Sequence, residues 1–241
     1  MKRSLLALDM PLFEENWNRL NEQVRDLTPP GTEPARILPV TKYLVRDDAR
    51  KLLDGEYGPL GENRADQLVE KTNPGQDQDG WHFIGRLQRN KIRDVAPRIS
   101  LFHSLDSERL AASLDTWVED HLVAQLPVLV QVNIAGESRK AGIDPVQASD
   151  LILRWIDLFP ALRFCGLMTM APNWSPEQSR PIFRALHQLR TTIQEQLPAS
   201  TIPQFEHLSM GMSGDWKVAV EEGATWIRLG RALYQPQEEV N

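Results

Sequence analysis

The spacing of hydrophobic residues divides the chain into an N-terminal segment and the remainder. Near the N-terminus, over residues 12–27, apolar side chains recur three or four residues apart, at Phe13, Trp17, Leu20, Val24 and Leu27. This spacing predicts a helix with one apolar face. The Pro29-Pro30-Gly31 segment then ends the helix. From Arg36 onward, short apolar runs rich in β-branched residues alternate with helical patterns.

Eight of these apolar runs have the length and composition of buried strands. They cover 37–42, 57–61 (the weakest), 81–85, 101–104, 127–134, 162–170, 206–210 and 226–230. Helical patterns separate them, over 45–53, 64–71, 90–96, 108–122, 145–159, 176–197 and 215–221. The pairs Asp106-Ser107, Asp144-Pro145 and Ser175-Pro176 are expected helix starts.

This alternation predicts an α/β fold built as a single (β/α)8 TIM barrel. An open doubly wound sheet would show fewer strands and a glycine-rich dinucleotide fingerprint, which the sequence lacks. We assign residues 1–35 to an N-terminal helix and lead-in that covers the bottom or side of the barrel. Residues 36–241 form the barrel, and no composition break splits the chain into two domains.

Composition removes several classes of function. The net charge of −6 and the isoelectric point near 5.5 argue against a nucleic-acid partner. No apolar run reaches the length of a membrane span, and residues 1–10 lack a cleavage pattern, so we expect a cytoplasmic protein. The single cysteine, Cys165, excludes an internal disulfide and a thiolate metal cluster, and it is expected in the core.

Candidate chemistry begins at Lys42, which ends the first predicted strand. Such a position lies at the carboxyl end of a strand, where α/β barrels carry their sites, although this stretch alone also fits a solvated surface lysine. The segment 207–215 runs from strand seven into a turn with glycines and a serine, and strand eight ends at Gly230-Arg231. Loops after strands seven and eight commonly form phosphate sites in these barrels, although a plain strand-to-helix turn has the same composition.

Strand parity brings these signals together. Leu38, Val40 and Lys42 share one face of strand one, while Arg228 and Gly230 share one face of strand eight. The two strands are neighbours in a closed barrel, so an inward lysine and an inward arginine would stand beside the phosphate cradle. A lysine amine beside an anion site suits a Schiff base with an aldehyde phosphate, for which pyridoxal 5′-phosphate (PLP) is the obvious candidate.

In that arrangement the PLP phosphate lies near Ser213 and Gly230, and Arg228 faces the pyridine nitrogen. A guanidinium cannot give up its proton, so it would keep that nitrogen unprotonated and weaken the ring as an electron sink. The expected consequence is low intrinsic carbanion chemistry.

Several blocks of sequence resemble the pyridoxal phosphate homeostasis protein family, in order over about residues 36–234. They are Val40-Thr41-Lys42, Gly61-Glu62-Asn63, the run from Trp81 to Lys91, His103-Ser104-Leu105-Asp106, Gln131-Val132-Asn133, the run from Gly166 to Met170, the run from His207 to Ser213, and Arg228-Leu229-Gly230. The family is similar to the barrel domain of bacterial alanine racemase standing alone. Two positions depart from the family pattern. Tyr43 follows Lys42, and Arg231 stands where many members of the family have threonine.

The resemblance implies PLP held as an internal aldimine on Lys42, with Asn63 near the ring and Arg228 at the ring nitrogen. It also implies phosphate contacts from Met210, Ser213, Gly230 and Arg231. His82 lies in a motif block and is a further candidate for cofactor contact, with a hydrogen-bonded core histidine as the alternative. His103 is expected to be structural.

We therefore predict a PLP-binding protein of intracellular PLP homeostasis that lacks robust turnover, with no catalytic residue and no metal. The alternatives are a PLP-dependent amino-acid racemase and a barrel that binds a sugar or nucleotide phosphate. A racemase needs a second acid/base, which in alanine racemase comes from a second domain, and Tyr43, Tyr57 and Tyr234 are not in evident positions for it. Candidate partners are apo PLP-dependent enzymes, and we expect a monomer. The basic group Arg86, Arg89, Asn90, Lys91 and Arg93 fits either a solvated loop or anion recruitment.

Overall fold

Eight parallel strands form the centre of the computed structural model, which describes residues 6–73, 78–122, 124–137 and 141–236. The strands are β1 (Arg36–Pro39), β2 (Leu60–Glu62), β3 (Trp81–Phe83), β4 (Leu101–Leu105), β5 (Leu126–Gln131), β6 (Leu162–Met168), β7 (His207–Ser209) and β8 (Trp226–Leu229). Their hydrogen-bonded order is β1-β8-β7-β6-β5-β4-β3-β2. A bridge between Val40 and Gly61 joins the ends of β1 and β2, so the sheet closes almost completely. The predicted TIM barrel is confirmed.

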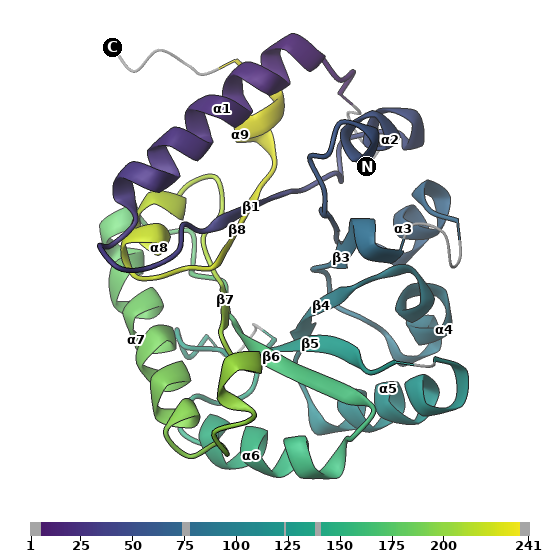
Figure 1. Cartoon of the computed structure of the whole chain (residues 1–241), viewed down its shortest axis with the longest axis vertical. Coiled ribbons are helices and arrows are strands. Elements are labelled where there is room, and N and C mark those ends of the chain that lie inside the picture. The colour runs from purple at the N-terminus through teal and green to yellow at the C-terminus, as the bar shows by residue number, and fades with distance from the viewer. Residues whose placement is uncertain (1–5, 74–77, 123, 138–140, 237–241) are drawn as a thin grey trace.

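Helices surround the strands as a ring (Figure 1). The α-helices are α1 (Met10–Leu27), α2 (Arg46–Asp54), α3 (Ala65–Lys71), α4 (Ile92–Val95), α5 (Glu108–His121), α6 (Ala148–Leu158), α7 (Pro176–Gln194), α8 (Trp216–Glu221) and α9 (Arg231–Tyr234). Short 3-10 helices are η1 (Gln78–Gly80), η2 (Arg89–Lys91), η3 (Ala96–Arg98) and η4 (Ile202–Gln204). No described helix is long and apolar enough to cross a membrane.

The N-terminal helix covers the side of the barrel rather than its bottom. The helix that follows β8, α9, has only four residues, and α1 lies against it (Figure 1). Phe13, Leu20 and Val24 of α1 are buried, and Asn16 Nδ2 donates to the carbonyl oxygens of Leu233 and Gln235 at 3.3 and 3.2 Å. The division into 1–35 and 36–241 stays a prediction, and residues 1–5 and 237–241 lie outside the described part of the chain.

Several predicted boundaries are wrong for local reasons. The first strand ends at Pro39 instead of residue 42, because the chain turns and Leu44 N donates to Thr41 O at 2.8 Å. The second strand starts after Pro59, which has no N–H for a sheet ladder. The helix expected from Pro145 starts at Ala148, because Asp144 Oδ1 accepts from Val146 N at 2.8 Å and forms a turn first. Helix α9 was not predicted.

The barrel interior is separate from the main hydrophobic core, which lies between strands and helices. A small apolar cluster consists of Leu101, Leu129, Cys165 and Met168. Cys165 is buried, as expected, and burial raises the pKa of its thiol. On the same side of β4 as Leu101, His103 bonds to Ser209 of β7. Because β4 and β7 are not neighbours in the sheet, this bond crosses the interior and shows that part of it is polar.

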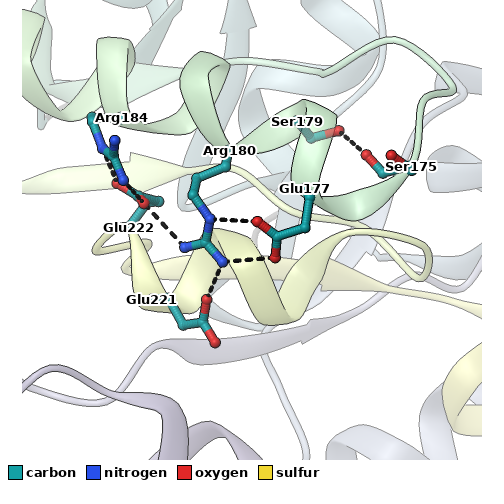
Figure 2. Close-up of polar contacts among 7 residues, drawn as sticks. All are labelled: Ser175, Glu177, Ser179, Arg180, Arg184, Glu221 and Glu222. Carbon is teal, nitrogen blue, oxygen red and sulfur yellow. Dashed lines mark hydrogen bonds and ion pairs between the residues drawn. The ribbon is translucent and has the colours of Figure 1, made fainter.

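An ionic cluster joins α7 to α8 on the outside of the barrel. Arg180 of α7 contacts Glu177 on its own helix at 2.8 Å, and Glu221 and Glu222 at 2.6 and 3.1 Å (Figure 2). Arg184 adds a contact to Glu222 at 2.7 Å. These contacts connect α7 to the helix that precedes β8.

Candidate functional site

A cavity of about 400 Å³ opens at the carboxyl ends of β1, β2 and β8 and at the turn after β7. Its volume lies within the roughly 300–1,000 Å³ usual for small-molecule sites. The lining residues are Val40, Lys42, Tyr43, Asn63, Ile84, Met170, Met212, Ser213, Gly214, Arg228, Gly230 and Arg231. The structure therefore brings together Lys42, Asn63, Ser213, Arg228, Gly230 and Arg231, but not His82 and Met210.

The amine of Lys42 stands at the cavity wall without a counter-ion. Its side chain is partly exposed, and Nζ lies 5.0 Å from the centroid of the Tyr43 ring. Among the described residues, no side chain or carbonyl forms a hydrogen bond or ion pair with this amine. Lys42 is thus available to react with or bind a ligand, and Tyr43, whose sequence position gave no evident role, faces the same cavity.

A buried ion pair fixes the turn that carries Lys42. Lys71 Nζ lies 2.6 Å from Glu62 Oε2 and donates to Thr41 O at 2.8 Å, while both charged side chains are almost fully buried. Thr41 Oγ1 donates to the same carboxylate at 3.2 Å, and Asn63 N donates to Glu62 Oε1 at 2.8 Å. One carboxylate thereby positions the residues on either side of the cavity, at Lys42 and Asn63.

Asn63 carries an unused polar atom. Its Oδ1 is buried and has no hydrogen-bond partner among the described residues. Buried amide oxygens are normally paired, so an unpaired one that belongs to a cavity-lining residue suits a site that a ligand completes. Gly85 permits this arrangement, because a Cβ there would lie 1.9 Å from Asn63 O.

The turns after β7 and β8 form an anion cradle. Within the described part of the chain, the backbone N–H groups of Ser213, Gly214, Gly230 and Arg231 have no hydrogen-bond acceptor. Adjacent free N–H groups on tight turns attract anions, and the Ser213 hydroxyl and Arg231 guanidinium line the same space. The first turn requires Gly211, whose φ is +93° and whose Cβ would meet Ala219 Cβ at 2.6 Å.

Arg228 lines the cavity, is buried and is held by two hydrogen bonds. Its guanidinium donates from Nη1 to Ser209 Oγ at 2.7 Å and from Nη2 to Thr169 O at 3.0 Å. Burial lowers the pKa of Arg228 to about 10, and nearby Asp215 opposes that shift. Arg228 therefore remains a positively charged, donor-only group at neutral pH.

A chain of hydrogen bonds continues from Arg228 into the barrel. Ser209 Oγ lies 2.8 Å from His103 Nδ1, and His103 Nε2 lies 3.0 Å from His82 Nδ1. Ser209 Oγ accepts from Arg228, which can only donate, and the directions of the two bonds that involve the histidines depend on the histidine tautomers.

Both histidines are neutral. Burial, followed by the charges of His207 and Arg36, lowers the pKa of His82 to about 3. Burial also lowers the pKa of His103 well below its ordinary value, with further contributions from His82 and Arg228. His82 does not line the cavity and is linked to Arg228 through His103 and Ser209. Met210 lies in the hydrophobic core.

Sequence reasoning did not find Glu62, Lys71, Ser209 and Thr169 as parts of the site. Glu62, Thr169 and Ser209 do lie inside the motif blocks that carry the family resemblance, which was the available signal. Lys71 ends a helical pattern and gave no signal of its own. His103, expected to be structural, supports Arg228 through Ser209.

Fold and cavity together define a class: a (β/α)8 barrel with an amine and an anion cradle at the carboxyl ends of its strands. The family model of the alanine racemase N-terminal domain matches residues 9–238. A relative from Aquifex aeolicus is 36% identical over 206 residues, covering 85% of this chain and 88% of the relative. One from Vibrio cholerae is 41% identical over 180 residues, covering 73% and 74%. Both are named pyridoxal phosphate homeostasis protein.

A solved structure agrees with this relationship. PipY of Synechococcus elongatus, solved with PLP bound, superposes with a TM-score of 0.77 at 29% identity, covering 92% of this chain and 100% of that one. The chain belongs to the pyridoxal phosphate homeostasis protein family, whose barrel is that of the alanine racemase N-terminal domain.

Proposed function

We propose that this protein binds PLP at the cavity of Lys42 and acts in PLP homeostasis without robust turnover of its own. The observation that carries the proposal is the convergence of three groups in one cavity. These are the unpaired amine of Lys42, the donor-only guanidinium of Arg228 and the anion cradle of the turns after β7 and β8.

The lining residues fit the parts of PLP. When bound, PLP supplies an electrophilic aldehyde on an electron-withdrawing ring. Lys42 Nζ is the nucleophile for the aldehyde carbon, and the N–H groups of the cradle with Ser213 and Arg231 hold the phosphate. Asn63, with its unpaired Oδ1, lies between these groups and the opening toward β3 and β4.

Arg228 accounts for the proposed lack of turnover. Its side chain carries a permanent proton at neutral pH and is fixed by Ser209 and Thr169. A ring nitrogen that accepts a hydrogen bond from this guanidinium stays unprotonated, which reduces the electron-withdrawing power of the ring. The residues thus hold the cofactor and do not favour carbanion chemistry.

The racemase alternative rests on one observation, the presence of Tyr43 in the cavity lining. Tyr57 donates to Glu14 on α1, and Tyr234 is buried away from the cavity. We expect no exchange of the α-proton when alanine is incubated with the PLP-loaded protein in deuterated water and followed by NMR. Steady exchange that Tyr43→Phe removes would establish the racemase instead.

The proposal also covers the recipients of PLP, the oligomeric state and the location of the protein. The recipients of the bound PLP are apo PLP-dependent enzymes, the protein is a monomer, and it works in the cytoplasm. Size-exclusion chromatography with light scattering tests the monomer. Transfer of PLP to an apo-enzyme, followed by recovery of that enzyme's activity, tests delivery.

The direct test of the proposed function is the site of attachment. PLP-loaded protein is reduced with borohydride and digested, and mass spectrometry is expected to find the PLP-derived mass on Lys42. Lys42→Ala is expected to lose both the label and the absorbance band near the visible edge, whereas the exposed control Lys217→Ala keeps them. Labelling spread over surface lysines, or unchanged in Lys42→Ala, would refute the proposal.

A further inference from the structure

A second, larger cavity lies beside the cofactor pocket. It measures about 770 Å³ and is formed by the loops after β2, β3 and β4. We call it the basic cleft. Its lining residues are Asn63, Arg64, Ala65, Asp66, Arg86, Leu87, Gln88, Arg89, Lys91, Asp106, Ser107, Arg109 and Leu110. Asn63 also lines the cofactor pocket, so the two cavities adjoin at this residue.

The charge of the basic cleft is opposite to that of the whole chain. Five of its lining side chains are cationic and two are anionic, a difference of +3, whereas the chain has a net charge of −6. A concave surface of one sign concentrates counter-ions of the other sign. The loops that form the cleft therefore attract an anion that the rest of the molecule repels.

Some cationic side chains of the basic cleft are paired with carboxylates of the protein, and others are not. Arg64 is paired with Asp66 at 2.7 Å, and Lys91 with Asp94 at 3.0 Å. By contrast, the guanidinium groups of Arg89 and Arg109 have no hydrogen bond or ion pair with any residue that the structure describes.

Arg86 reaches its only described partner, Asp106, at 4.0 Å, and its side chain is 82% exposed. Arg86 and Arg89 follow β3, and Arg109 lies in the first turn of α5, so arginines from two separate segments present donors to one space.

A helix N-terminus also favours an anion in the cleft. Helix α5 begins there with Ser107 as its N-cap; the Ser107 side chain makes no capping hydrogen bond and donates to Asp106 Oδ1 at 3.1 Å. The buried, unpaired Oδ1 of Asn63 marks the border with the cofactor pocket; as an acceptor it suits a donor group of a ligand and not its phosphate. The floor is formed by the buried side chains of Leu87 and Leu110, which suits a ligand with an apolar body.

We propose that the basic cleft is a second, non-covalent binding site for a small phosphorylated molecule. A phosphate monoester carries between one and two negative charges at neutral pH, and its oxygens match the planar donor fork of arginine. A monocarboxylate carries one negative charge and would leave most of the +3 charge of the cleft lining unbalanced. The inference rests on the proposed function only for the expectation that such ligands reach this face of the barrel.

The test uses protein in which PLP is already attached irreversibly to Lys42, so that the cofactor pocket is occupied. PLP-loaded protein is reduced with borohydride, so that Lys42 is blocked, and equilibrium dialysis then measures binding of pyridoxine 5′-phosphate, which has no aldehyde. Unphosphorylated pyridoxine and inorganic phosphate are measured in parallel. We expect one equivalent of pyridoxine 5′-phosphate to bind, pyridoxine to bind at least tenfold more weakly, and 0.5 M salt to weaken binding several-fold.

Variants locate the site. Arg89→Gln combined with Arg109→Gln is expected to weaken binding at least tenfold. The control, Arg25→Gln combined with Arg93→Gln, removes the same charge outside the cleft lining and is expected to stay within twofold of the original protein. Circular dichroism and the thermal midpoint check that both double variants are folded.

Three results would overturn the proposal: no binding to the reduced protein, equal binding of pyridoxine, or equal losses in both double variants. Competition by inorganic phosphate with full displacement would still support a phosphate site. The dialysis is repeated on Lys42→Ala, so that failure of the attachment at Lys42 and failure of the second site remain distinguishable.

Discussion

At the scale of single residues, the cavity depends on charges that the protein buries and pairs. Glu62 and Lys71 form an ion pair inside the molecule, and Arg228 is fixed by Ser209 and Thr169. A buried pair contributes little beyond a well-packed apolar pair, but removal of one partner leaves an uncompensated charge. These residues matter because they set where Lys42, Asn63 and the Arg228 guanidinium lie.

Lys71→Met is therefore expected to lower the free energy of unfolding by about 3–5 kcal/mol. The physical reason is that Glu62 loses its ion-pair partner and Thr41 O loses a donor. Urea denaturation measures the loss. The exposed control Lys217→Met is expected to change stability by less than about 0.5 kcal/mol.

The same experiment includes a double variant. Glu62→Gln in the Lys71→Met background removes both charges and is expected to recover part of the lost stability. If Lys71→Met is as stable as the original protein, the pair does not hold the Lys42 turn.

At the scale of elements, Arg180 contacts Glu177 on its own helix and joins α7 to α8 through Glu221 and Glu222 (Figure 2). Arg180→Gln is expected to lower the free energy of unfolding by about 1 kcal/mol, since the side chain is partly exposed and its contacts are screened by solvent. The loss should shrink in 0.5 M salt. Thermal unfolding at two salt concentrations measures both effects.

A matched control comes from a half-exposed ion pair that lies within one helix. Arg50 of α2 lies 2.9 Å from Asp54, and Arg50→Gln is expected to cost less than about 0.5 kcal/mol. An equal cost for the two substitutions would mean that the three-carboxylate cluster adds nothing to the packing of α7 against α8.

At the scale of the whole molecule, the two neutral histidines link stability to pH. In the unfolded chain they bind protons below about pH 6.5, whereas His82 in the folded protein remains neutral down to about pH 3. The unfolded state thus binds more protons in this window, so the free energy of unfolding rises with pH and falls as pH drops. Each buried histidine is expected to lower the free energy of unfolding by about 2 kcal/mol between pH 7 and pH 5.

Urea denaturation at pH 7, 6 and 5 measures this slope. His82→Gln is expected to reduce the slope by about 1.4 kcal/mol per pH unit at the acidic end, because one proton-binding group is lost from the unfolded chain. His121→Gln, at an exposed histidine at the end of α5, is the substitution control. An unchanged slope in His82→Gln would mean that His82 is protonated in the folded protein.

The alternation of apolar runs and helical patterns was enough to predict the barrel, since both periods are local properties of the chain. Strand parity placed Lys42 and Arg228 at one mouth, and the glycine turns at 211–214 and at Gly230 indicated the anion cradle beside them. Boundaries failed where hydrogen bonds within the loops ended or delayed an element, as at Thr41 and Asp144.

By itself the sequence determined the fold class, the lysine, the arginine and the two turns, because neighbouring residues and a regular strand order specify them. Only the tertiary structure decided that Lys71 pairs with Glu62, that His82 contacts His103, and that arginines from separate segments share one cleft. His103 and Ser209, for example, are 106 residues apart in the chain and meet across the barrel. Such contacts depend on how non-adjacent strands close around the interior, and no local pattern records that geometry.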